Sequence, residues 1–255
     1  MFMQGRLPGF LSFKSAIDLV RIGRDHDGGY LISKIDIDNS DLLIGLGIND
    51  DWSFEEHFVA KKDVEVFAYD GSISQKHFFN QFIKSLTRID NPKIALHSFF
   101  TLLRYRKFFS KEKVCHIEKY IGLNSSNQDY CTLSYILDST KHQNIFLKID
   151  VEGSEYRLLD TLIFNQSRIS GVVLELHDCD IHLATIKTFI KDFELKLVHI
   201  HANNYSPVRL DDQLPLVLEL TFSKYCKLAD ETYLPHRFDM PNNRNESEIY
   251  LAIED

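Results

Sequence analysis

Acidic and histidine residues follow three apolar runs of the sequence, and residues of these types can bind a metal ion or move a proton. Asp150, His177 and His201 each stand at or just after the end of such a run. If the runs are neighbouring parallel strands, their ends open into one crevice. A carboxylate and two imidazoles suit a divalent cation there, and they equally suit a base that removes the proton of an alcohol. We therefore predict that Asp150, His177 and His201 are catalytic and form a candidate metal site.

Residues near this group fit structural roles better. His199 is expected to face the other side of the sheet from His201. Glu152 and Glu155 stand where a helical pattern begins, and an acid there stabilises the helix without any catalytic role. Each histidine taken singly is also typical of a hydrogen-bonded structural residue, so the prediction depends on the agreement of three strand ends.

A glycine pair after the first core run indicates a turn that binds a nucleoside. Gly45 and Gly47 leave a strand and enter a helix, so the backbone can approach a ligand closely and offer free N–H groups. Asp70 ends the next run about twenty residues later, where an acid usually holds the two ribose hydroxyls. Gly71 and Ser72 follow it. We predict that these five residues bind a cofactor, with a turn needed only for strand-helix packing as the alternative.

The residues after the glycine pair favour one cofactor. A dinucleotide turn would carry a third glycine at position 50, but Asp50 and Asp51 stand there, and two carboxylates repel a pyrophosphate. S-adenosylmethionine has no phosphate, and its sulfonium and amino group are positive. The glycine-lysine pattern of phosphate-binding loops is absent from the sequence. The predicted cofactor is therefore S-adenosylmethionine, with an NAD(P)-dependent oxidoreductase as the alternative.

The elements that must position these residues alternate along the chain. From residue 41, short apolar runs separated by helical patterns predict βαβ units around a mainly parallel sheet. The last two runs have no helical pattern between them and predict an antiparallel hairpin. The runs are residues 42–44, 64–69, 114–121, 145–149, 172–176, 195–200 and 216–222. We expect a doubly wound, Rossmann-like α/β fold with seven strands, as in class I methyltransferases.

Helix starts and the two ends of the chain complete this plan. Ser53 with Glu56 fits a capping box, and Ser154 before Glu155 fits a helix cap. Residues 21–32 predict a small β ribbon, and residues 249–253 predict a last short strand. No linker or repeat divides the chain. We expect one domain, with an N-terminal extension (1–40), a core (41–225) and a C-terminal loop and strand (226–255).

Composition narrows the class of protein. The net charge of −8 over 255 residues argues against a nucleic-acid surface. The apolar stretch in the first residues is too short for a signal peptide or a membrane span. The four cysteines are dispersed along the sequence, as in proteins with reduced thiols. We expect a cytoplasmic enzyme. Residues 104–107 are interpreted as a solvated basic helix face. Core packing is expected for Phe99, Phe100, Phe108 and Phe109.

The segment from Lys148 to Tyr156 carries a resemblance to a known family. Its Lys-Ile-Asp-Val-Glu-Gly, followed by a small residue, Glu and an aromatic, resembles the most recognisable segment of FkbM-like methyltransferases. The resemblance extends from about Arg21 to Phe222 and includes the ribbon turn, the glycine turn with its following helix, and Asp70. It implies a methyltransferase that uses S-adenosylmethionine.

The same resemblance implies roles for several residues. Gly45, Gly47 and Asp70 would line the cofactor site, and Asp150 would face the substrate. Asp27 and Tyr30 of the ribbon would cover the cofactor. Members of the family often methylate sugar hydroxyls in polysaccharides and natural products. The expected function is therefore O-methylation of a sugar hydroxyl, on a nucleotide-activated sugar or a surface-polysaccharide precursor.

Two polar loops, residues 201–212 and 233–248, are expected to close the crevice over the acceptor. A small molecule other than a sugar is an alternative acceptor. A catalytically inactive domain that binds a partner is an alternative function. The sequence leaves open the need for a divalent cation and the formation of a homo-oligomer.

Overall fold

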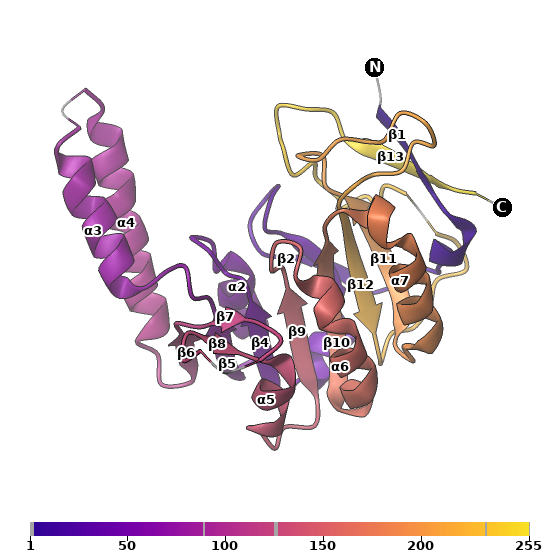
Figure 1. The fold of residues 1–255 in the computed structure, drawn as a ribbon, viewed down its shortest axis with the longest axis horizontal. Helices are drawn as coiled ribbons and strands as arrows, with labels where there is room; N and C mark the ends of the chain where they lie inside the picture. Colours follow the sequence, from indigo (N-terminus) through magenta and orange to yellow (C-terminus); the bar gives the residue numbers. More distant parts are fainter. Residues whose placement is uncertain (1–2, 89, 125–126, 233, 255) are drawn as a thin grey trace.

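Seven strands form the central sheet of the computed structural model, which describes residues 3–88, 90–124, 127–232 and 234–254. Their order is β11-β12-β10-β9-β4-β5-β6 (Figure 1). The bounds are β4 Leu42–Leu46, β5 Glu65–Tyr69, β6 Val114–Ile117, β9 Ile145–Ile149, β10 Ile169–Leu176, β11 Lys196–Ala202 and β12 Leu218–Ser223. Neighbours are parallel except at β12, which is antiparallel to β10 and β11. The predicted α/β fold and its terminal hairpin are confirmed.

Strand β4 marks the point where the winding of the sheet changes direction. It pairs with β5 on one side and with β9 on the other. After β4 the chain forms β5 and β6 on one side of β4, and it then returns to form β9 on the other side. A crevice opens at the carboxyl ends of strands at such a point, and ligands of α/β proteins bind there.

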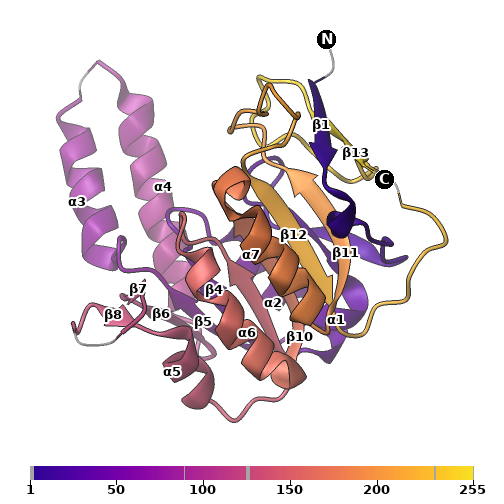
Figure 2. The same ribbon diagram turned by 45° about the vertical axis from the view of Figure 1, so that its right-hand side comes forward.

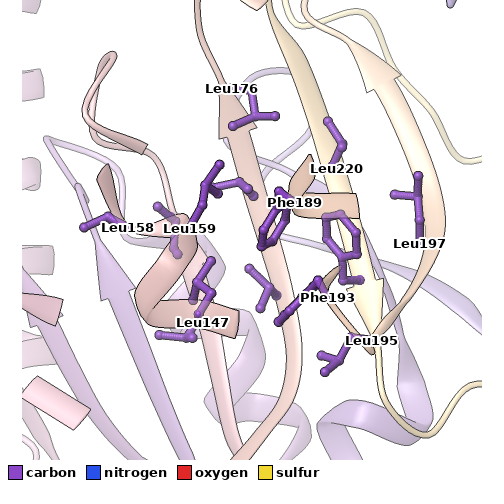
Figure 3. Close-up of a cluster of buried hydrophobic side chains, with 14 of the residues drawn as sticks. Leu147, Leu158, Leu159, Leu176, Phe189, Phe193, Leu195, Leu197 and Leu220 are labelled. Atoms are coloured by element: carbon purple, nitrogen blue, oxygen red, sulfur yellow. The ribbon is translucent and has the colours of Figure 1, made fainter. Parts of the chain in front are cut away.

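Helices cover both faces of the sheet (Figure 2). One face packs α5 (Leu133–Asp138), α6 (Leu159–Asn165) and α7 (Cys179–Asp192), and the other packs α1 (Lys34–Asn39) and α2 (Ser53–Lys61). Side chains alternate along each strand, so Leu147 of β9 joins the first core while its neighbour Phe146 joins the second. Figure 3 shows Leu147 in the first core, together with Phe189 of α7. Burial on both faces explains the continuous apolar runs.

The two ends of the chain meet beside the sheet. β1 (Met3–Leu7) pairs in parallel with β13 (Ile249–Ile253), and β2 (Leu19–Ile22) pairs antiparallel with β3 (Tyr30–Ser33). The predicted ribbon and last strand are thus present. Shorter elements are the pair β7 (Tyr120–Ile121) and β8 (Tyr130–Cys131) and the 3-10 helices η1 (Gly9–Leu11), η2 (Glu155–Arg157) and η3 (Gln166–Arg168).

A helical hairpin lies between β5 and β6 and projects from the body of the protein (Figure 1). It consists of α3 (Gln75–Leu86) and α4 (Pro92–Phe109). The expectation of core packing is wrong for Phe99 and Phe100 of this hairpin. Phe108 is buried, but Phe99 and Phe100 are exposed because this part of the hairpin extends beyond the sheet. No helix in the described residues is long and apolar enough to cross a membrane.

Both predicted helix caps are wrong in detail. Helix α2 begins at Ser53 itself, and the carboxylate of Asp51 accepts the N–H of Ser53 at 3.1 Å. Ser154 makes no capping hydrogen bond. The carboxylate of Glu155 instead accepts the N–H groups of Val151 (3.3 Å) and Gly153 (3.0 Å). In both places an acid replaces the expected serine hydroxyl.

Candidate active site

A cavity of about 710 Å³ opens at the carboxyl ends of β4, β5, β9 and β10, where the change of winding predicts a ligand site. The turn of the β2–β3 ribbon forms one side. A second side consists of Lys119, Tyr120 and Tyr130 on and beside the β7–β8 pair, and residues 203–206 after β11 form a third. The volume is within the range of small-molecule sites.

The turn after β4 accommodates only glycine at its closest approach to β9. Gly47 has a φ of +76°, and a Cβ atom on it would lie 1.7 Å from the carbonyl oxygen of Asp150. The N–H of Gly47 donates to the carbonyl of Tyr69 at 2.9 Å. The Nζ of Lys148 donates to the carbonyl of Gly47 at 2.5 Å. The turn thereby joins three strand ends and leaves Gly47 in the cavity wall.

Gly45 serves the packing of helix α2 instead of the cavity wall. It lies within β4, and a Cβ atom on it would lie 2.3 Å from Oε1 of Glu55. Glu55 is fully buried, and burial raises its pKa to about 7. Gly45 does not line the cavity. The structure thus supports, for this residue, the alternative of close strand-helix packing.

Asp70 joins the end of β5 to the glycine turn. Its Oδ2 accepts the N–H groups of Ile48 (3.0 Å) and Asn49 (2.8 Å), and its Oδ1 accepts the N–H (2.7 Å) and hydroxyl (2.5 Å) of Ser72. These four donors match the four lone-pair directions of a carboxylate. A ribose hydroxyl would have to displace one of them. Asp70, Gly71 and Ser72 all line the cavity, as the cofactor prediction requires.

The predicted ribbon residues lie at the same cavity. Tyr30 is buried, and its hydroxyl donates to Oε2 of Glu175 at 3.0 Å. Asp27 lines the cavity and forms an ion pair with Arg24 at 3.3 Å. Burial raises the pKa of Asp27 against the opposing effect of Arg24. The ribbon therefore covers the cavity, in agreement with the placement implied by the family resemblance.

His177 and a buried glutamate form a dyad at the end of β10. The Nδ1–H of His177 donates to Oε1 of Glu155 at 2.9 Å, and Glu155 is fully buried. The side chain of His177 is 19% exposed and lines the cavity, with its Nε2 3.5 Å from Oε2 of Glu152 and 3.8 Å from Oε1 of Glu175. The bond to Glu155 raises the pKa of His177 against the effect of burial. Such a carboxylate orients an imidazole as a base.

Asp150 and Glu175 lie beside this dyad. Asp150, Glu175 and His177 each offer one ligand atom, and these atoms lie within 4.8 Å of one another. Burial raises the pKa of Glu175, with a further contribution from Asp150. Both oxygens of Glu175 already accept hydrogen bonds, one from Tyr30 and one from Asn203 at 2.9 Å. Asp150, Glu175 and His177 can therefore share protons and hydrogen bonds as well as offer ligands to a cation.

Lys148 supplies the positive charge next to this group. It is buried, and its Nζ lies 3.1 Å from Oδ2 of Asp150. Burial works to lower the pKa of Lys148, but Asp150 and Glu55 outweigh it and raise the pKa. An ammonium group at this distance repels a cation bound to Asp150. The electrostatics therefore favour the base over the metal site.

His201 does not join Asp150 and His177. Its Nδ1 and Nε2 lie 3.0 Å from Glu219 and 3.2 Å from Glu248, away from the cavity wall. The prediction treated β10 and β11 as neighbours, but β12 lies between them. Two strand spacings of about 4.8 Å therefore separate His201 from the β10 end.

His199 and His201 share one face of β11, which corrects the expectation that they face opposite sides. Residues two apart in a strand point the same way. His199 lies 3.0 Å from Asp239, and the charges of both histidines lower the pKa of that residue. Residues 234–248 therefore cover these histidines instead of closing the cavity; Tyr233 of the predicted loop lies outside the described residues.

Two residues of the candidate site are not predicted from the sequence. Glu175 precedes His177 by two positions in an extended segment, and this spacing could have indicated that both point into the same crevice. Glu155 was assigned to helix stabilisation, and only the folded chain shows its bond to His177. Of the predicted loops, residues 203–206 line the cavity, through Asn203, Tyr205 and Ser206.

The sheet order, the antiparallel β12, the glycine turn and the cavity at the strand ends are those of the class I methyltransferase fold, whose members use S-adenosylmethionine. A model of the methyltransferase FkbM domain matches residues 36–192, which is more than half of the chain. The chain belongs to the FkbM methyltransferase family. A search of curated protein sequences gives no match.

Solved structures to which the chain is similar include the following three. The fibrillarin pre-rRNA processing protein of Methanococcus jannaschii has a TM-score of 0.38 and 12% identity, over 75% of this chain and 70% of that one. For the precorrin-6y C5,15-methyltransferase of Geobacter metallireducens the values are 0.39 and 13%, over 74% and 84%. For the spermidine synthase of Thermotoga maritima they are 0.40 and 8%, over 74% and 55%.

Proposed function

We propose that this enzyme transfers a methyl group from S-adenosylmethionine to a sugar hydroxyl, with His177 as the general base. The observation that carries the proposal is the dyad of His177 with the buried Glu155, whose Nδ1 to Oε1 distance is 2.9 Å. An alcohol is a poor nucleophile at neutral pH until a base takes up its proton. His177 lines the same cavity, and its Nε2 is the ring nitrogen that is not bonded to Glu155 and that would take up this proton.

The residues around the cavity fit the cofactor. Gly47 permits the close approach of backbone that a bound nucleoside requires, and Asp70 holds the N–H groups of Ile48 and Asn49 in one arrangement. We propose that Asp70 acts on cofactor binding through this turn. The carboxylates of Asp50 and Asp51 also line the cavity, where they favour a ligand with positive charge.

The chemistry needs one proton acceptor and good alignment. When bound, S-adenosylmethionine supplies a methyl group activated by a sulfonium. Transfer to the acceptor oxygen would leave S-adenosylhomocysteine as the product and release the hydroxyl proton. His177 takes the hydroxyl proton at Nε2 while Glu155 keeps Nδ1 protonated and the ring oriented. Asp150, held by Lys148, is placed to accept a hydrogen bond from the acceptor.

Protonation of His177 depends on the cofactor. In the free protein the bond to Glu155 raises its pKa, which favours the imidazolium. A positive ligand beside the ring lowers the pKa again. Binding of a cationic cofactor next to the ring would therefore shift His177 toward the neutral form that can act as a base, whereas the product, which lacks the sulfonium charge, would leave the pKa closer to its value in the free protein.

The choice of a sugar depends on the family and on the far side of the cavity. Tyr120 and Tyr130 offer aromatic surfaces on one side of the cavity. On another side Tyr205 offers an aromatic surface, next to the polar groups of Asn203 and Ser206. Sites for small polar ligands combine aromatic walls with a few such groups. We propose a nucleotide-activated sugar or a polysaccharide precursor as the acceptor. All four cysteines are free, and we propose a cytoplasmic enzyme, since a reducing compartment keeps thiols in this state.

Labelled S-adenosylmethionine tests the acceptor class. The enzyme is incubated with nucleotide sugars, free sugars, catechols and amines, in EDTA and then with an added divalent cation. We expect label on a sugar, with full turnover in EDTA. Label on catechols or amines alone would contradict the sugar proposal, and loss of turnover in EDTA that Mg²⁺ restores would favour a metal at Asp150, Glu175 and His177 over the base.

A further inference from the structure

The α3–α4 hairpin is attached to the body only near its base. At that base, Trp52 of the body packs against Phe78 of α3 and against Tyr105 and Phe109 of α4, with ring centroids 5.6 to 5.8 Å apart. Beyond it the two helices pack against each other, and both views show them projecting away from the sheet (Figures 1 and 2). The outer half of the hairpin is therefore available to a partner.

The hairpin exposes large apolar side chains in two stripes along its length. They recur at helical spacing, at positions 79, 83 and 86 on α3 and at 96, 99, 100 and 103 on α4. The side chains are Phe79, Ile83, Leu86, Leu96, Phe99, Phe100 and Leu103, and each is between 38% and 56% exposed. Phe82 and Phe99 connect the helices beside these stripes, with ring centroids 5.3 Å apart. Exposed apolar side chains gathered in this number on one hairpin mark an interaction site.

The charge of the hairpin is opposite to that of the rest of the protein. Residues 75–109 contain seven Lys and Arg and one Asp, a formal charge of +6. The other 220 residues contain 22 Lys and Arg and 36 Asp and Glu, a formal charge of −14. Three of these cations, Arg104, Arg106 and Lys107, lie near the base, where Arg104 pairs with Glu56 of the body at 3.0 Å. The projecting part of the hairpin, which carries most of the exposed apolar side chains, holds the cations Lys84, Arg88 and Lys93. The partner is expected to be both apolar and anionic.

We propose that the α3–α4 hairpin docks on the surface of an anionic lipid bilayer. Helices with apolar aromatic and aliphatic side chains beside Lys and Arg bind in the interface of such membranes, and anionic lipids attract clustered cations. A second copy of the chain fits this surface less well, because two facing hairpins would bring together two charges of +6. A nucleic acid would neutralise the cations and leave the apolar stripes in water.

The base of the hairpin is linked through His116 to the cofactor turn. The hydroxyl of Tyr105 on α4 lies 2.6 Å from Nδ1 of His116, and Nε2 of His116 lies 3.1 Å from the carbonyl of Asp70. The hairpin base thus contacts the residue that shapes the cofactor turn. The docking proposal does not depend on the proposed acceptor, since it follows from the hairpin alone.

Vesicle co-sedimentation tests this proposal with the full chain. Phosphatidylcholine vesicles with about 30 mol% phosphatidylglycerol should retain the protein, and pure phosphatidylcholine should not. The variant Phe79→Ser, Leu96→Ser, Phe100→Ser should lose roughly tenfold or more of this binding. Lys84→Glu with Lys93→Glu should also weaken it, and so should raising the salt from about 0.1 M to about 0.5 M. The matched control Phe164→Ser, Ile181→Ser, Leu210→Ser changes exposed apolar side chains of the body and should bind normally.

Several outcomes would overturn the proposal. Absence of binding to anionic vesicles would do so, as would equal binding by the hairpin variant and the wild type. Dimers in analytical ultracentrifugation that the hairpin variant converts to monomers, without vesicle binding, would assign the surface to a second copy of the chain. Circular dichroism and S-adenosylhomocysteine binding report whether each variant is folded, and neither readout involves the hairpin surface.

Discussion

His177 and His201 both stand at the end of an apolar strand and lie near acidic residues, yet their surroundings differ. His177 has one nitrogen bonded to a buried carboxylate and the other at a cavity. His201 has both nitrogens beside carboxylates, those of Glu219 and Glu248. Carboxylates only accept hydrogen bonds, so both nitrogens of His201 carry protons. The comparison teaches that a place at a strand end does not make a histidine a candidate base. Both nitrogens of His201 are within hydrogen-bond distance of acids, whereas Nε2 of the cavity-lining His177 lies farther away, 3.5 Å from Glu152 and 3.8 Å from Glu175.

The largest effect is expected from removing the imidazole at the cavity. His177→Gln should lower kcat by about 10² to 10⁴, the usual contribution of a general base, with S-adenosylhomocysteine binding retained. His201→Gln is the matched change on the neighbouring hairpin and should leave kcat per folded molecule within a few-fold of wild type. Equal losses in both variants, measured by single-turnover methyl transfer, would remove the distinction between the two histidines.

The two histidines should also differ in how much each contributes to the free energy of unfolding. Removing His201 leaves Glu219 and Glu248 with an uncompensated charge, and breaking a buried pair in this way typically costs about 3–5 kcal/mol. His177→Ala should cost less, because its buried partner Glu155 keeps the N–H groups of Val151 and Gly153. Urea unfolding of both variants measures this. A His201→Ala variant as stable as His177→Ala would contradict the assigned roles.

The pH dependence of stability sharpens this comparison. Burial alone would lower the pKa of His201, but Glu219 and Glu248 raise it well above the ordinary value. Because the folded pKa is above the unfolded value of about 6.5, this stabilisation is complete below about pH 6.5 and is lost as pH rises through the folded pKa. Melting temperatures of wild type should therefore decline at alkaline pH more steeply than those of His201→Gln.

The fold could be predicted from the sequence further than the site could. Apolar runs with helical patterns between them determine a parallel sheet, because few topologies satisfy that alternation. The failure at His201 has a different cause: order along the chain is not order in the sheet, and β12 separates β10 from β11. Glu155 was missed since a local role at a helix start is sufficient to explain an acid there, and its contact with His177 spans 22 residues.

A smaller effect is expected from the residue that orients the base. Glu155→Gln keeps an acceptor for Nδ1 but removes the charge that raises the pKa of His177, so kcat should fall roughly 10- to 100-fold. The rising limb of kcat/KM against pH should shift to lower pH. An unchanged pH profile in this variant would show that Glu155 does not act on His177 during catalysis.

The smallest effect concerns the cofactor turn. Asp70→Ala should weaken S-adenosylhomocysteine binding by about tenfold, since charge-assisted hydrogen bonds contribute about 1.5–3 kcal/mol. If Asp70 acts by holding the turn, the loss is the same for S-adenosylhomocysteine and for its 2′,3′-dideoxyribose analogue in calorimetry. A loss confined to the ligand that carries the hydroxyls would instead support the ribose contact predicted from the sequence.

The most direct test of the account is a histidine NMR titration of the whole protein, free and with S-adenosylmethionine, with signals assigned through His177→Gln and His201→Gln. We expect His177 to titrate above its ordinary pKa of about 6.5 in the free protein and at lower pH with the cationic cofactor bound. His201 should remain protonated over the same range. A His177 signal that does not respond to the cofactor, or a His201 signal that titrates near its ordinary pKa, would contradict the assignment of base and structural cation.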